Sequence, residues 1–121
     1  MTEMKQKFDL EERTAKFGIA VIDFCRTIGE NSITRPLIVQ LVRAGTSVGA
    51  NYCEANDAES KKDFVHKIGI CKKESRESMH WFHMIGSAVP ESRDKARKLW
   101  QEAKELNLIF AAIMKSAGYR R

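Results

Sequence analysis

Glu77, His80 and His83 are the residues whose types and spacing come nearest to a metal site. Glu-x-x-His on one helix is the spacing with which di-iron bundles present two ligands inward. Such a centre needs the same motif on a second helix, and the only other histidine, His66, has Asp63 as its sole acidic partner upstream. The heptad pattern also places all three residues away from the apolar seam. We therefore expect no metal and no cofactor, and a solvated or intersubunit face here.

Nucleophilic catalysis is not indicated either. Cys71 and Ser75 have no histidine held near them by helical spacing, and a thiol on a buried seam is inert. The chain has no Cys-x-x-Cys pair and no glycine-rich phosphate loop after a strand. Cys25, Cys53 and Cys71 all lie within helical patterns, which favours reduced, buried thiols over a disulfide framework. We expect a protein that is not an enzyme.

Positive charge is the property that points most directly to a ligand. The chain has 21 Lys and Arg against 16 Asp and Glu, a formal net charge of +5, which favours a polyanion partner. Many of the cations alternate with acids, as in Arg93-Asp94-Lys95, and this also fits an ordinary solvated surface. The candidates for nucleic-acid contacts are Lys61, Lys62, Lys72, Lys73, Arg76, Arg97, Lys98, Arg120 and Arg121.

Capping signals predict where the first two helices lie. Asp9 followed by Glu12 is a capping box, which predicts a helix that begins near Leu10 and ends about residue 28. Thr34 can cap a second helix that runs to about residue 57. Pro36 is tolerated in its first turn, because an amide there has no intrahelical partner.

The second half of the chain predicts two more helices. Ser60 with Asp63 is a second capping box, and Pro90 must end the helix that it opens. A fourth helix is expected from about Ser92, with Gly118 as a left-handed terminator. Four helices with short connections predict antiparallel neighbours. The fold expected for residues 1–121 is therefore one all-α domain, an up-down-up-down antiparallel four-helix bundle.

The stretch from Gln40 to Glu54 carries the closest packing. Its small residues let a neighbouring backbone approach, and in an exposed helix each glycine would only cost about 1 kcal/mol against alanine. These small residues are Ala44, Gly45, Gly49 and Ala50. The 3-4 spacing of the apolar residues also makes Asn51 a polar member of the seam.

An antiparallel pairing of the second and third helices, with a turn centred near Ser60, predicts specific partners, because paired positions have a constant sum. We predict an ion pair between Glu54 and Lys67 and a hydrogen bond between Ser47 and Glu74. The remaining pairs are Gln40 opposite Trp81 and, in one seam layer, Asn51 with Cys71.

A longer motif carries a family resemblance over essentially the whole chain. Its most specific segments are QLVRA at 40–44, SVGANY at 47–52, EA at 54–55, SKKDF at 60–64, Lys67, KE at 73–74, Glu77 and Trp81. This pattern resembles the four-helix-bundle family of proteins encoded by 23S rRNA intervening sequences, especially the branch with S-V-G-A-N-Y-x-E-A. Many members have glycine where this chain has Ala55.

The resemblance implies a cytoplasmic bacterial protein that assembles as a homopentameric ring. A related group, the accessory variability determinant proteins of diversity-generating retroelements, binds nucleic acid and a reverse transcriptase, so RNA or DNA and such a partner protein are both implied. We assign packing or assembly roles, rather than catalytic ones, to Arg43, Ser47, Asn51, Glu54, Lys67, Glu74, Glu77 and Trp81.

Our leading interpretation is a non-enzymatic homo-oligomer that binds RNA or DNA through repeated Lys and Arg side chains. The alternative is a protein-binding assembly or accessory module without nucleic-acid affinity, and a metal-dependent bundle enzyme is third. No apolar run approaches the roughly 20 residues that a membrane span needs, and the first residues lack the apolar segment of a signal peptide. A cytoplasmic protein without membrane contact is expected.

Overall fold

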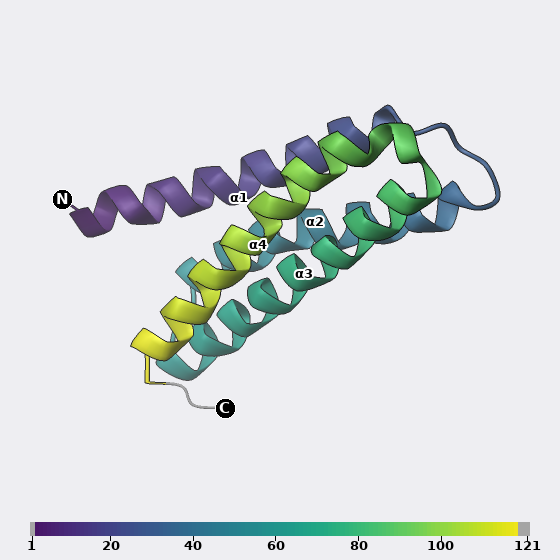
Figure 1. The fold of residues 1–121 in the computed structure, drawn as a ribbon. Helices are drawn as coiled ribbons and strands as arrows, with labels where there is room; N and C mark the ends of the chain where they lie inside the picture. The colour runs from purple at the N-terminus through teal and green to yellow at the C-terminus, as the bar shows by residue number, and fades with distance from the viewer. Residues whose placement is uncertain (1, 119–121) are drawn as a thin grey trace.

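The computed structural model of the chain describes residues 2–118, with side chains from residue 10 onward. Consecutive long helices run in opposite directions, so the start of α1 and the end of α4 lie at the same end of the molecule (Figure 1). The described elements are α1 (Thr2–Arg26), α2 (Thr34–Asn56), α3 (Lys61–Ala88), η1 (Pro90–Ser92) and α4 (Arg93–Ser116). The predicted up-down-up-down four-helix bundle is confirmed.

The core is a layer of aromatic and aliphatic side chains enclosed by the four helices. Phe82 of α3 meets Phe17 and Phe24 of α1 edge to face, with ring centroids 6.3 and 5.7 Å apart. Tyr52 of α2 contacts Phe110 of α4 at 6.3 Å. Each pair joins helices that are distant in sequence, so these rings fix how the bundle closes. Edge-to-face contacts contribute beyond the apolar area that they bury.

The seam of α2 passes through Tyr52 rather than Asn51. Tyr52 is buried, whereas Asn51 is half-buried and its Nδ2 donates to the carbonyl of Ser47, 2.9 Å away. The expected layer of Asn51 with Cys71 is therefore wrong: the Cys71 thiol instead donates to the carbonyl of Val48, at 3.5 Å. Burying the tyrosine ring is favourable, and the amide is satisfied within its own helix.

The predicted start of the first helix and the predicted capping residue of the second need correction. Helix α1 begins at Thr2, not near Leu10, because residues 2–8 are mostly good helix formers and continue the helix past Asp9. Helix α2 does begin at Thr34, but Asn31 caps it: its Oδ1 accepts from the amides of Ile33 and Thr34 at 2.8 and 2.9 Å. Thr34 itself is buried, and its hydroxyl holds the preceding loop by donating to the carbonyl of Gly29 at 2.7 Å and accepting from the amide of Asn31 at 3.0 Å.

The other predicted ends are confirmed. Ser60 accepts from the amide of Asp63 at 3.0 Å and caps α3, which ends at Ala88, just before Pro90. The turn to α4 is the short 3₁₀ helix η1, which the sequence pattern did not predict. Gly118 follows α4 with φ of 85°, a left-handed conformation that glycine adopts without strain.

Gly45 lies where a side chain of α1 packs directly against the backbone of α2. A Cβ added there would lie 2.7 Å from Cγ2 of Val21, so there is no room for one. At Gly49 the nearest atoms, of Thr14, would be 3.4 Å away. The predicted tight packing of this stretch is present, and Gly45 is the residue that permits it.

Helix α1 is the loosest partner in the bundle. Of the four pairs of adjacent long helices, α1 and α4 have the smallest contact, and the N-terminal turns of α1 diverge from α4 (Figure 1). Arg13 joins α1 to α4, donating through Nε and Nη2 to Glu102 at 2.8 Å and through Nη2 to Glu105 at 2.9 Å.

Among the described residues, no helix is long and apolar enough to cross a membrane.

Candidate nucleic-acid interface

The acidic side of α3 faces α2 and is neutralised within the chain. Arg43 of α2 donates to Glu74 at 3.2 Å and to Glu77 at 2.5 Å. Glu74 is nearly buried, so its charge needs this partner. The predicted ion pair between Lys67 and Glu54 is also present, with Nζ to Oε1 at 2.5 Å.

The predicted hydrogen bond between Ser47 and Glu74 is wrong. The Ser47 hydroxyl donates to the carbonyl of Arg43, one turn earlier in its own helix, at 2.7 Å. The longer, charged Arg43 side chain reaches the carboxylate instead. Trp81 lies on the same flank, half-buried, and its ring meets His80 edge to face at 4.8 Å. Its Nε1 has no hydrogen-bond partner among the described atoms.

The outward side of α3 carries cations and histidines instead of acids. We call this set the α3 stripe: Lys62, His66, Lys73, Arg76, His80 and His83. Successive members are three, four or seven residues apart, so they share one face of the helix. All six are exposed, and none forms an ion pair with another described side chain. Helix α3 therefore has on one side a row of exposed basic and histidine side chains, unpaired within the described part of the chain, and its Glu74 and Glu77 are bound by Arg43 on the side that faces α2.

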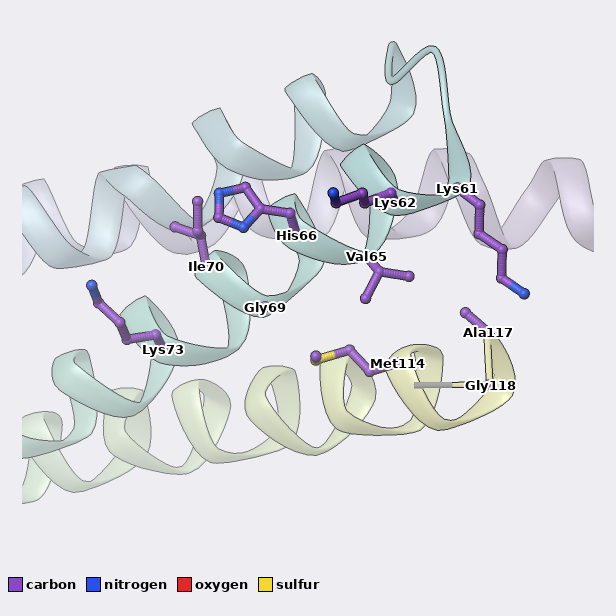
Figure 2. A pocket seen from close by; sticks show the side chains of 10 residues that line it. All are labelled: Lys61, Lys62, Val65, His66, Gly69, Ile70, Lys73, Met114, Ala117 and Gly118. Carbon is purple, nitrogen blue, oxygen red and sulfur yellow. The ribbon is translucent and has the colours of Figure 1, made fainter. Parts of the chain in front are cut away.

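A shallow groove of about 740 Å³ lies beside the first half of the stripe, between α3 and the end of α4. In Figure 2, Val65 and Met114 form its apolar floor, and the amines of Lys61 and Lys73 lie at its two ends. Met114 lies close to Gly69, since a Cβ added to Gly69 would be 3.6 Å from its Cε. The groove offers cations around an open apolar floor.

The remaining predicted cations are scattered. Lys72 is half-buried, and its carbonyl accepts from Asn107 of α4 at 2.8 Å. Lys98 is exposed on α4, and Arg97 lines a second groove, between the end of α3 and the start of α4. Arg120 and Arg121 lie outside the described residues. Lys61, Lys62 and Lys73 thus line one groove, and Arg76 continues the α3 stripe beyond it, but the structure does not bring all the predicted cations onto one face.

Sequence reasoning missed the histidines of this face and the aromatic ring of the second groove. His66, His80 and His83 were weighed only as metal ligands, yet their three- and four-residue spacing to lysine and arginine was visible in the sequence. Trp100, which lines the second groove, was not among the candidate site residues. Charge periodicity along α3 is the signal that finds the stripe.

The buried thiols do not have the properties of nucleophiles. Burial raises the pKa of Cys71 to about 12 and that of Cys25 to about 11, which favours the unreactive neutral form. Cys53 is exposed, which corrects the expectation that all three cysteines are buried. Within residues 10–118, no three metal-ligating side chains are grouped. The site that stands out is a surface with cations, suited to binding anions.

The fold and this surface define a small all-α four-helix bundle with a basic face. The sequence matches the family described as 23S rRNA-intervening sequence protein over residues 6–112. The chain therefore belongs to that family. No curated protein matches it significantly.

A solved structure shares the fold. It is a protein of unknown function from the S23 ribosomal protein family of Bacteroides thetaiotaomicron VPI-5482. The match has a TM-score of 0.78 and 24% identity, and it covers 88% of this chain and 98% of that one. The similarity supports the four-helix architecture.

Proposed function

We propose that this protein is a non-enzymatic homo-oligomer, pentameric as the family resemblance implies, that binds the phosphate backbone of RNA or DNA. The observation that carries the proposal is the α3 stripe, whose exposed cations have no described acidic partner. Two acids of the same helix, Glu74 and Glu77, are already bound by Arg43 of α2. Phosphate oxygens are the natural partners of unpaired lysine and arginine side chains, and a histidine beside them can donate a ring N–H.

The spacing of the stripe suits a polyanion better than a single ion. Residues 62 to 83 span about 30 Å along a helix that rises 1.5 Å per residue. One phosphate would engage one or two of its members, whereas a nucleic-acid backbone can follow the whole row. A closed oligomer would repeat the row on every chain, and multivalency would increase the affinity.

The test is fluorescence anisotropy with a structured RNA, a duplex DNA and a single strand, each titrated across a salt series. Binding should weaken linearly in log salt. The double charge reversal K73E/R76E should reduce the slope by about 1.4 to 1.8, because each lost phosphate contact removes about 0.7 to 0.9. The matched control is K16E/R26E, which changes net charge equally but on α1.

Two outcomes would overturn the proposal. Size-checked protein that binds none of the three at low salt has no phosphate-binding face. Equal losses in K73E/R76E and K16E/R26E would show a response to net charge rather than a site. Binding of a partner protein that survives K73E/R76E, without nucleic-acid affinity, would support the alternative of an assembly module.

A further inference from the structure

A second groove, of about 640 Å³, lies where the α3 stripe ends, between the last turns of α3 and the first turns of α4. Its walls include Phe82, Trp100, His83, Arg93, Arg97 and Gln101. We propose that this groove receives an unstacked nucleobase, so that the protein prefers single-stranded nucleic acid over uninterrupted duplex. The inference rests on the proposed function, since the stripe would deliver the strand to the groove.

The ring of Trp100 is the expected platform for stacking. Trp100 is half-buried, and Phe82, which also lines the groove, is fully buried in the core. The groove therefore has a partly exposed aromatic ring next to the packed core. The ammonium group of Lys104 lies over the Trp100 ring in a cation–π contact, 5.5 Å from the ring centroid. A lysine chain is flexible and can turn to a phosphate. Stacking on an aromatic ring tolerates any base, because every base has a π face.

The polar wall fits the rest of a nucleotide. Arg93 and Arg97 are exposed and pair with no described acid, so their guanidinium groups are free for phosphate. Gln101 offers an amide that can both donate to and accept from a base edge. His83 belongs to both the stripe and the groove, so the row of phosphate contacts leads directly to the ring.

A duplex cannot use this groove without losing a base from its stack. Base stacking and pairing hold the bases inside the helix, and extruding one costs a few kcal/mol. A single strand, a loop or a bulge presents its bases freely. The geometry therefore distinguishes two nucleic acids that the stripe alone would bind in the same way.

The experiment compares a thymidine strand of about 12 nucleotides with an abasic strand of equal length, which has the same phosphates and no bases. Trp100 is read out alone in a W81F background, since the chain has 2 tryptophans. Phe at position 81 loses no hydrogen bond, because the indole Nε1 there has no partner among the described atoms. Size-exclusion chromatography checks that this background keeps its assembly state.

We expect the thymidine strand to bind roughly tenfold more tightly than the abasic strand and to quench the Trp100 fluorescence. Trp100→Ala should bring the two strands to equal affinity, and Trp100→Phe should keep most of the difference. Arg97→Gln should weaken binding of both strands, whereas Lys95→Gln, exposed on the same helix outside the groove, should not.

Equal affinity for the two strands with no quenching would overturn the base-binding groove and leave the phosphate-binding function standing. Failure of both strands to bind at low salt would overturn both. Quenching that persists with the abasic strand would also contradict the proposal, because the ring would then respond to phosphate rather than to a base. Trp100→Phe keeps the test valid if Trp100→Ala fails to fold.

Discussion

At the scale of single residues, Arg43 joins α2 to α3 by binding a carboxylate that is nearly buried. It is 44% exposed, whereas the Glu74 side chain that it binds is only 10% exposed. Arg43→Ala would leave a nearly buried carboxylate without its cation. We expect a loss of about 2 to 3 kcal/mol in the free energy of unfolding, measured by urea denaturation.

The double variant R43A/E74Q separates the charge from the contact. If the cost arises from the uncompensated carboxylate, making residue 74 neutral should recover part of the stability that Arg43→Ala loses. Lys67→Ala is the exposed counterpart: Glu54 is 59% exposed, so losing that pair should cost under about 1 kcal/mol. Equal costs for Arg43→Ala and Lys67→Ala would contradict this account.

Residue contacts were only partly predictable from the sequence. The constant-sum rule found Lys67 opposite Glu54, because it places backbone positions opposite one another. It missed that Arg43 takes Glu74, since a long side chain can reach a partner off the pairing line, and a short hydroxyl such as Ser47 binds its own helix. A heptad pattern fixes which residues are neighbours, and it leaves the choice among them to charge, length and burial.

At the scale of the elements, the spacing of α1 and α2 depends on the missing side chain of Gly45. Alanine there gains about 1 kcal/mol in helix propensity, but its Cβ would lie 2.7 Å from buried, branched Val21. Overpacking costs about 1 to 3 kcal/mol, so we expect Gly45→Ala to destabilise the protein by about 1 kcal/mol in a urea titration.

Gly69→Ala is the matched control for the glycine prediction. A Cβ at that position would have only the flexible end of Met114 near it, at 3.6 Å, so helix propensity should dominate and the variant should be more stable by up to about 1 kcal/mol. If Gly45→Ala were also stabilising, the contact with Val21 would not prevent a side chain at position 45, and this explanation would be wrong.

Element boundaries followed from the sequence where one residue type decides them. Ser60, Pro90 and Gly118 each have a backbone role that few other residues can take, and all three ends are where they were predicted. Asn31 and Thr34 are both capping types, so the sequence could not decide between them. The candidate site was harder to predict, because the stripe and the groove depend on which face of α3 meets α4.

At the scale of the whole molecule, several large apolar residues are exposed on the bundle, and we expect the proposed ring to bury some of them. The side chains of Ile19, Ile33, Val39 and Leu108 are each 58 to 65% exposed, on α1, the first loop, α2 and α4. Fully burying a side chain of this kind contributes about 1.5 to 3 kcal/mol of free energy, and in a closed ring every chain would gain this contribution. These residues lie outside the α3 stripe, so assembly and phosphate binding can use different surfaces.

Light scattering on a sizing column tests the assembly directly. We expect a mass near five times the 13.8 kDa of the chain, because the resemblance implies a pentamer. Ile19→Glu and Leu108→Glu each place a charge on exposed apolar surface, and at least one should lower the mass, whereas Lys95→Glu on α4 should not. The mass of a single chain at about 10 μM, well above the dissociation constants typical of specific complexes, would overturn the ring. Each chain would then bind through a single α3 stripe, and the gain in affinity from multivalency would be lost.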